Sequence, residues 1–311
     1  MVTLPSTANA PVTPRKKKLK ISAAYAFLFP YLTVLFLFGI APAIYAFVLS
    51  FSSFEMGKPQ FFQGGFENFV VAYGDFRFMI ALKNTLSFVA LSLPVGLLFA
   101  IFMSLVLHLT HDRIANVART VYFLAGAVSG PVLVLIFVFV FDPLISPFGF
   151  LMRPFGLTSP DQIITAKYII PIFVILRLFW SAGGSIAIFY GALQGISTEV
   201  IEASLIDGCN VWTMSWYIKI PLIKAWMLNT LITAFVFNMT IYAEPSLIGA
   251  AMQGTSPVNT YWSLNMLGQQ YVVYGGNFGA SAAISLLQVG LSLGAAIFIV
   301  SRSKFYETDL T

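Results

Sequence analysis

The chain has 311 residues, of which 58% are hydrophobic and only 9% are charged. A soluble domain carries about 25% charged residues, so this composition excludes a protein whose whole surface faces water. The apolar residues form long runs without the strict alternation of a membrane barrel, which predicts an all-α polytopic membrane protein. The single cysteine, Cys209, excludes an internal disulfide and a metal site built from cysteines.

The N-terminal part of the chain is polar and basic. Residues 1–21 are rich in Pro, Thr and Ala and contain the run RKKKLK, which predicts a disordered cytoplasmic tail. A membrane surface explains basic residues beside an apolar run, so the net charge of +5 does not indicate nucleic-acid binding. Residues 22–51 form an apolar run too long for the core of a secretory signal, and we expect an uncleaved first span.

Five more apolar runs follow, at residues 84–107, 120–141, 168–190, 223–243 and 279–300. Each is about 20 residues long, enough at about 1.5 Å per residue to cross a hydrocarbon core of about 30 Å. We therefore predict six transmembrane helices within a membrane domain of residues 22–301. Prolines in or beside these runs predict kinks, because a proline leaves a backbone carbonyl without its helical donor. These prolines are Pro30, Pro42, Pro94, Pro131 and Pro171.

The distribution of Lys and Arg predicts the orientation of the spans. If the N-terminus is cytoplasmic, eleven of the 17 Lys and Arg residues fall in cytoplasmic segments, five fall in outer loops, and Arg177 remains within a span. We therefore expect both termini in the cytoplasm, with residues 302–311 as a C-terminal tail. The outer loops are then residues 52–83, 142–167 and 244–278.

Two histidines, His108 and His111, lie three residues apart with Asp112 beside them. These side chains can ligate a metal ion. A hydrated loop edge explains them better, and we predict no metal site.

Residues 197–221, between the fourth and fifth runs, predict a helix, a glycine turn and a second helix. Ser197 is a fair N-cap for the first helix. Gly208 lies where a helix ends in a left-handed residue, and Asn210 can cap the second helix. Pro221 fits the start of the fifth span, where its missing N–H leaves no bond unmade. Such a rigid element at a membrane surface transmits force or binds a partner better than a flexible loop does.

The same stretch resembles the EAA loop of permease subunits in binding-protein-dependent ABC importers. That signature reads Glu-Ala-Ala, then a glycine six residues after the glutamate, then Ile-x-Leu-Pro starting ten residues after the glycine. The chain matches it with Glu202-Ala203-Ser204, Asp207-Gly208 and Ile218-Lys219-Ile220-Pro221. It departs at Ser204, Cys209 and Ile220, and an aromatic residue expected near position 215 is displaced to Trp216. The acid, the glycine and the proline are retained; an ordinary interfacial helix pair is the alternative interpretation.

The resemblance extends over nearly the whole chain. FLFPYLTVLFLFGIAPAIYAFVLSF and GGFENF are similar to the N-terminal part of carbohydrate permeases of the maltose and glycerol-phosphate type. FDPLISPFGFLMRPFGL resembles their third outer segment, and EPSLIGAAMQGTSPVNTYW resembles the segment after their fifth span. The motif Thr-Gly-Gly-Pro is common in that last segment, and this chain matches it only partly, with Gly254-Thr255-Ser256-Pro257.

The resemblance implies how such a chain works. The sequence contains no GxxxxGK[ST] loop, so it lacks the phosphate cradle of an ATPase. Two cytoplasmic ABC ATPase subunits would bind ATP and Mg²⁺ and supply the energy, while this chain binds no cofactor and is not an enzyme. A second, related permease would complete the pore in the lipid bilayer of the cytoplasmic (inner) membrane. An extracytoplasmic solute-binding protein would deliver the solute to the outer loops.

The resemblance also implies which residues couple the ATPase to the spans. Glu202 would supply a charge or a helix cap at the dock, and Gly208 would supply the turn. The full set of expected coupling residues is Glu199, Glu202, Ala203, Asp207, Gly208, Ile218 and Pro221.

Candidate residues on the substrate path are polar or charged side chains within or near the spans. Arg177 lies inside the fourth run and Glu244 at the outer end of the fifth, so their depths are similar and they can pair. They either line the path or form a structural or interfacial pair. Sugars need amides that bond hydroxyls and aromatic rings for stacking, and these spans carry both. The further candidates are Trp180, Asn238, Tyr242 and Gln288.

Three functions remain open from the residues. The first is an importer permease for a sugar, oligosaccharide or polyol-like solute, with an anionic solute such as a phosphorylated polyol as a variant favoured by Arg177. The second is an ion-coupled secondary transporter that uses Arg177 and Glu244 as a relay, which leaves residues 197–221 unexplained. The third is a membrane scaffold without transport. The spans contain no cluster of basic residues, which favours a neutral glycan.

Overall fold

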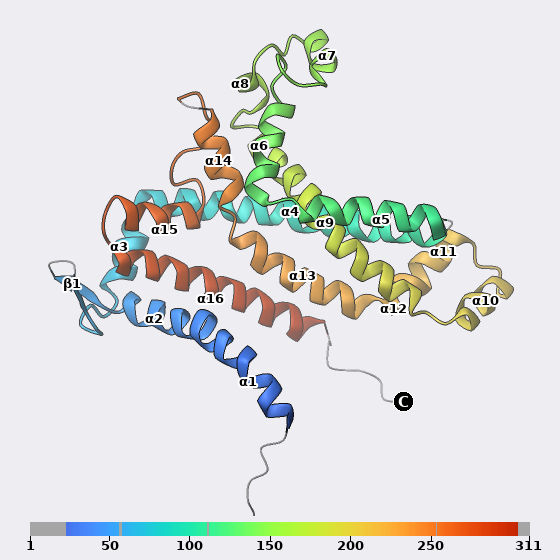
Figure 1. Cartoon of the computed structure of the whole chain (residues 1–311), viewed down its shortest axis with the longest axis horizontal. Coiled ribbons are helices and arrows are strands. Elements are labelled where there is room, and N and C mark those ends of the chain that lie inside the picture. Colours follow the sequence, from blue (N-terminus) through green and yellow to red (C-terminus); the bar gives the residue numbers. More distant parts are fainter. Residues whose placement is uncertain (1–22, 56–57, 111, 253, 304–311) are drawn as a thin grey trace, which may run out of the picture. The chain divides into compact units, whose positions relative to one another are not determined.

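The computed structural model describes residues 23–55, 58–110, 112–252 and 254–303 (Figure 1). The predicted tail of residues 1–21 lies outside the described residues, as does most of the predicted tail of residues 302–311. The chain divides into two compact units, Met1–Tyr45 and Ala46–Thr311, and each is described by itself.

The first unit contains one helical stretch. α1 (Ala23–Leu35) runs into a π-helical turn, η1 (Phe36–Ile40), and then into α2 (Ala41–Ser50), whose last residues belong to the second unit. Phe27–Ser50 is long and apolar enough to cross a membrane, as predicted. The widened turn lies directly before Pro42, whose ring does not fit against a regular preceding turn.

The second unit contains the remaining long helices. They are α4 (Phe76–Leu109), α9 (Ile169–Gln194), α13 (Lys224–Met239) with α14 (Ala243–Ala251) after a short break, and α16 (Phe278–Arg302). Across the described residues, five helices are long and apolar enough to cross a membrane, which confirms five of the predicted spans. α4 begins earlier than predicted, so Arg77 and Lys83 lie within a helix and not in a loop.

The third predicted span, residues 120–141, is wrong as a single helix. The structure has α5 (Asp112–Ala127) and α6 (Gly130–Val140), which are bent by 101° at the break between them. Ser129 adopts an extended ψ of 133°, and Pro131 stands in the first turn of α6. Proline suits a helix start and disrupts a helix interior, so this sequence begins a new helix. The described residues reach six spans only if this bent pair counts as one.

Helix α9 lies against α4 and α5 (Figure 1). Gly183 brings the α9 and α5 backbones together, because a Cβ at this position would lie 2.3 Å from the Tyr122 carbonyl oxygen. On the facing helix, a Cβ at Gly126 would lie 3.0 Å from the Trp180 carbonyl oxygen. Small residues allow such close backbone packing, which is a main source of helix association in a membrane.

Two apolar cores lie along α4 and α9. One is built around Phe88 and Phe173 and extends to α14 and α15 (Leu264–Val273). The other is built around Ile186 and Phe189 and extends to α5. The part of α4 between these cores carries the small residues Ser92 and Gly96, which line a cavity.

The segments between the spans are folded. Residues 52–83 contain an antiparallel hairpin, β1 (Ser53–Glu55) and β2 (Lys58–Gln60), in which Phe54 pairs with Pro59, and then α3 (Glu67–Gly74). Residues 142–167 contain α7 (Gly149–Met152), a 3₁₀ turn η2 (Arg153–Phe155) and α8 (Pro160–Ile163). Between α9 and α13 lie α10 (Thr198–Ile206), α11 (Val211–Met214), a π-helical turn η3 (Ser215–Lys219) and α12 (Ile220–Leu222).

Asn68 gives the GGFENF segment a structural role. Its Nδ2 donates to the carbonyl oxygens of Ser50 and Ser52 at 3.0 and 2.8 Å. A Cβ at Gly279, in the first turn of α16, would lie 2.5 Å from Asn68 Oδ1. This buried amide therefore ties the end of α2 to the start of α16.

Candidate functional site

The turn between α10 and α11 is held by backbone geometry. Gly208 has φ +81°, in the left-handed region that glycine adopts without strain. The N–H of Gly208 donates to Leu205 and the N–H of Cys209 donates to Ser204, the bond pattern of a Schellman motif. Asn210 Oδ1 then accepts from the Thr213 N–H at 2.8 Å and caps α11. At the other end, Ser197 occupies the N-cap position of α10, but its side chain makes no capping hydrogen bond.

The tip of this element, residues 202–212, is apolar and exposed. Ile206 is 86% exposed and Trp212 is 68% exposed, and Leu205 and Val211 beside them are also exposed. The carboxylates of Glu202 and Asp207 lie on the same exposed segment. Large apolar side chains gathered in this way beside charged groups are typical of a protein–protein contact surface.

The base of the element is anchored to two long helices. Lys219 of η3 is only 3% exposed, and its Nζ lies 3.1 Å from His108 Nδ1 near the end of α4. The His108 ring also packs edge-on against the Tyr190 ring on α9, with the ring centroids 6.2 Å apart. Burial lowers the pKa of Lys219 below its ordinary value. His108 is therefore a half-buried member of a packed junction, whereas His111 of the same prediction lies outside the described residues, so the hydrated edge stays a prediction.

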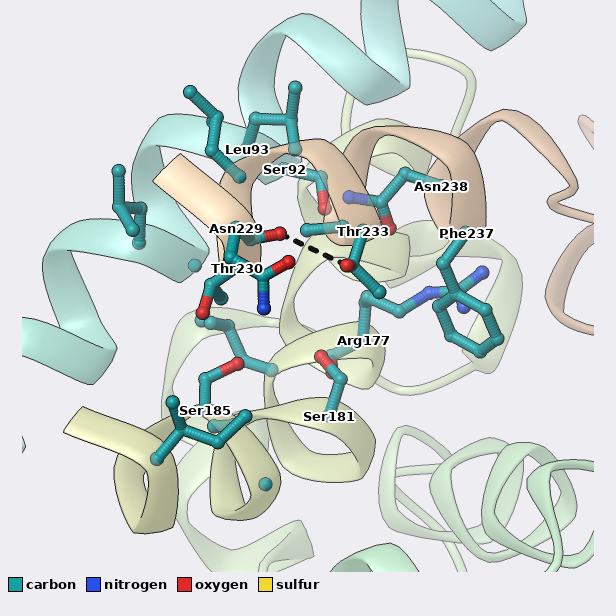
Figure 2. A pocket seen from close by; sticks show the side chains of 18 residues that line it. Ser92, Leu93, Arg177, Ser181, Ser185, Asn229, Thr230, Thr233, Phe237 and Asn238 are labelled. Carbon is teal, nitrogen blue, oxygen red and sulfur yellow. Dashed lines mark hydrogen bonds between the residues drawn. The ribbon is translucent and has the colours of Figure 1, made fainter. Parts of the chain in front are cut away.

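A cavity of about 380 Å³ lies between α4, α9 and α13 (Figure 2). Its wall carries hydroxyl and amide groups from all three helices. These groups belong to Ser92, Ser181, Ser185, Asn229, Thr230, Thr233 and Asn238. Thr233 bonds back to the Asn229 carbonyl oxygen at 3.0 Å, as a helical threonine does. Such a wall can bond the hydroxyl groups of a polar, uncharged molecule.

Arg177 reaches this cavity from α9 and forms an ion pair with Glu244. Its Nη2 lies 2.8 Å from Glu244 Oε1, and the two side chains are 6% and 5% exposed. The guanidinium also lies over three aromatic rings, at 4.7 Å from Phe237, 5.3 Å from Trp180 and 5.7 Å from Phe88. Figure 2 shows Arg177 beside Phe237 at the edge of the cavity. Rings at these distances stabilise a cation.

The ion pair leaves hydrogen-bonding capacity unused. Within the described part of the chain, neither Arg177 Nε nor Glu244 Oε1 has a hydrogen-bond partner. The 2.8 Å contact is therefore an ion pair by distance, and its N–H is not aligned on the carboxylate. Glu244 stands in the first turn of α14, where a negative charge is stabilised by the helix dipole.

Residues 92–304 match the family described as binding-protein-dependent transport system inner membrane component. The chain belongs to this family. It is 25% identical to the osmoprotective compounds uptake permease protein GgtC of Synechocystis sp., over 89% of this chain and 98% of GgtC. It is 27% identical to the arabinooligosaccharides transport system permease protein AraP of Bacillus subtilis, over 93% of this chain and 91% of AraP.

A solved structure shows the same fold. It is a chain of a bacterial alginate ABC transporter in complex with an alginate pentasaccharide-bound periplasmic protein, with a TM-score of 0.72 at 19% identity. The match covers 91% of this chain and 95% of that chain. These findings confirm the resemblance: the chain is a permease subunit of an ABC transporter in the inner membrane and not an enzyme. Membership of this family argues against the alternative interpretation as an ion-coupled secondary transporter.

The structure brings four of the six predicted path residues of this permease together. Arg177, Glu244 and Trp180 form one cluster, and Asn238 lines the cavity beside it. Tyr242 instead lies in the break between α13 and α14 and packs against the apolar core.

The sixth residue, Gln288, faces a different space. Its Nε2 donates to the Met239 carbonyl oxygen at the end of α13. It lines a second cavity of about 430 Å³ with Thr240 and Asn265. The break after α13 leaves carbonyl oxygens without helical donors, so this amide has a structural task.

The permease also carries polar wall residues that the sequence analysis missed. Ser181 and Ser185 on α9, and Asn229 and Thr233 on α13, are two pairs spaced four residues apart. Residues four apart share one face of a helix. That spacing within apolar runs is the signal that identifies the polar face. Among the described residues, no cluster of three metal-ligating side chains occurs.

Proposed function

We propose that this permease forms the pore of an ATP-driven importer for a sugar, an oligosaccharide or a polyol-like solute. The observation that carries the proposal is the rigid element between α9 and α13, with an exposed apolar tip and a buried base. Membership of the family supports the class of transporter. The names of the relatives GgtC and AraP support a polar organic solute.

The tip binds a cytoplasmic ABC ATPase subunit. Ile206 and Trp212 supply apolar contacts, and Glu202 and Asp207 place negative charge beside them. Gly208 keeps the turn narrow enough to enter a cleft. Two such ATPase subunits bind ATP and Mg²⁺, one against this permease and one against a second, related permease. This chain itself binds no cofactor.

Movement of the tip reaches the cavity through covalent and packed connections. α10 follows α9 after a short link, and η3 leads through α12 into α13. The contacts of Lys219 with His108, and of His108 with the Tyr190 ring on α9, add α4 to the same junction. The three helices that line the cavity are therefore all attached to the base of the docking element.

The docking role sets the orientation and the remaining partners. With the tip in the cytoplasm, both termini are cytoplasmic, and α3, α8 and α15 lie on the outer side, where a solute-binding protein docks. The exposed polar face of Ser181, Asn229 and Thr233 is unfavourable against lipid. A second, related permease covers this face and completes the pore.

Photo-crosslinking from the tip tests the proposal. Ile206→p-benzoylphenylalanine, introduced in the native host, is tolerated because the side chain is almost fully exposed. The matched control is Tyr274→p-benzoylphenylalanine, at an exposed position after α15. Irradiation of intact cells followed by mass spectrometry is expected to join position 206 to an ABC ATPase, and position 274 to no ATPase.

The two positions separate the ways in which the proposal can fail. An ATPase adduct at position 274 and not at position 206 contradicts the orientation. The absence of an ATPase adduct at both positions, with the chain folded in the membrane, contradicts the docking role of residues 202–212.

A further inference from the structure

We infer that Glu244 makes the membrane cavity selective for uncharged solutes by neutralising Arg177. This inference rests on the proposed function, because it assigns a selectivity to the cavity of an importer. Glu244 does not line the cavity itself and acts through Arg177, which does.

Arg177 would otherwise make the cavity attractive to anions. It is the sole charged side chain among the described residues that line the cavity. A guanidinium is always ionised and offers planar donors that match a carboxylate or a phosphate. A buried guanidinium at this cavity, left without a counter-ion, would therefore bind an acidic sugar or a phosphorylated polyol.

Glu244 and the surrounding rings remove that attraction. The carboxylate lies 2.8 Å from Arg177 Nη2, and the three rings cover the guanidinium at 4.7 to 5.7 Å. An anionic solute would have to displace Glu244 and leave its carboxylate buried without a partner. Leaving one ion of a buried pair without its partner is strongly unfavourable. A neutral solute bonds the hydroxyl and amide wall and leaves the pair intact.

The position of Glu244 is fixed by the break before α14. The chain leaves α13 at Met239, and Tyr242 precedes the first turn of α14 with φ −147° and ψ −52°. Helix α14 packs against α6 and α9. The carboxylate is therefore held against Arg177 by the packing of a separate helix, and its charge can be removed without altering the hydroxyl and amide wall.

Anion binding to the cavity tests the inference directly. The probe is iodide, which quenches tryptophan fluorescence on contact, and the reporter is Trp180, whose ring lies 5.3 Å from the Arg177 guanidinium. The full chain is placed in lipid nanodiscs. The Trp180 signal is taken as the difference between each protein and its Trp180→Phe counterpart.

In Glu244→Gln, iodide is expected to quench Trp180 in a saturable way. The iodide concentration at half-saturation should be at least roughly tenfold lower than in the wild type, because close charge pairs couple at least this strongly. Arg177→Gln combined with Glu244→Gln is expected to lose this quenching. Glu67→Gln, an exposed position on α3, changes the net charge equally and is expected to behave as the wild type.

A second measurement serves if Glu244→Gln is poorly folded. Iodide is then expected to raise the thermal unfolding midpoint of this variant and not that of the wild type, because the anion replaces the missing carboxylate. The inference is overturned if Glu244→Gln shows neither saturable quenching nor anion-dependent stabilisation. Neither readout needs an ATPase or transport, so this result is independent of the crosslinking test of the proposed function.

Discussion

Asp75, at the N-cap of α4, shows how one side chain joins two segments far apart in the sequence. It accepts hydrogen bonds from the Arg77 guanidinium at 2.6 to 3.0 Å and from the Tyr271 hydroxyl at 2.7 Å. The Arg77 guanidinium, with a smaller contribution from Tyr271, lowers the pKa of Asp75 to about 2. Burial, together with Asp75, raises the pKa of Tyr271 to about 12, so its hydroxyl remains a donor at neutral pH.

The lowered pKa predicts a pH-dependent loss of stability in Asp75→Asn. The pKa of the Asp75 carboxyl is about 3.8 in the unfolded chain and about 2 in the folded chain. The contribution of this carboxylate to the free energy of unfolding is therefore complete above pH 3.8 and is lost as the pH falls toward 2. The contribution is about 1–2 kcal/mol, allowing for the partial exposure of Arg77. Thermal unfolding in nanodiscs should show a difference between wild type and variant that is largest at neutral pH and vanishes near pH 2. A difference that stays constant over this range would contradict the assignment.

At the residue scale, the sequence predicted types of residue better than partners. Arg177 and Glu244 could be paired in advance because charges at similar depth in a membrane attract each other. His108 with Lys219, and Asp75 with Tyr271, could not be paired. Their contacts span 111 and 196 positions and depend on how the helices pack.

At the scale of the helices, Gly208 and Gly183 are needed for different reasons. Gly208 is needed for its backbone angle, since a Cβ there would meet nothing within 4 Å. Gly183 is needed for space, since its Cβ would lie 2.3 Å from the Tyr122 carbonyl oxygen. The spacing of a glycine after a short helix predicted the first role. The second role depends on the crossing of α5 and α9, which no local pattern encodes.

Gly183→Ala and its neighbour Gly184→Ala form a matched pair of variants. The first must push the α5 backbone away, and overpacking of this kind costs about 1–3 kcal/mol. The second adds a methyl group into open space and is neutral or stabilising by up to about 1 kcal/mol, because alanine favours a helix. Thermal unfolding midpoints in nanodiscs should fall for the first variant only. Equal midpoints would show that α5 and α9 do not cross at Gly183.

The bend between α5 and α6 marks the limit of prediction from hydropathy. The run 120–141 is long and apolar enough for one span, and hydropathy alone does not report a change of direction. Ser129-Gly130-Pro131 could have been interpreted as a helix start. In α13 and α14 the same difficulty arises, because the break at Thr240–Tyr242 contains no proline or glycine and is stabilised by Asn265 and Gln288 from other helices.

At the scale of the molecule, the class of protein followed from composition and from one joint pattern. A low charged fraction and long apolar runs predicted a helical membrane protein, and the spacing of Glu202, Gly208 and Pro221 predicted the family. The cavity could not be predicted as a unit. It is assembled from α4, α9 and α13, and only Arg177 and Asn238 of its wall were proposed from the sequence.

The whole molecule is proposed to work within an assembly. In this proposal an ATPase bound at residues 202–212 supplies the energy, because the sequence has no phosphate-binding loop, and a second permease covers the exposed polar face. Gly208→Leu separates these two contacts. A side chain at a left-handed position costs about 1–2 kcal/mol and also widens the tip, whereas the polar face on α9 and α13 is unchanged.

The most direct test is mass spectrometry of the proteins that co-purify with the tagged chain from its own host in a mild detergent. The wild type is expected to bring an ABC ATPase and a second permease. Gly208→Leu is expected to keep the second permease and lose the ATPase. Recovery of the folded wild-type chain alone, or as a homo-oligomer without any ATPase, would contradict the importer and the docking role of this loop.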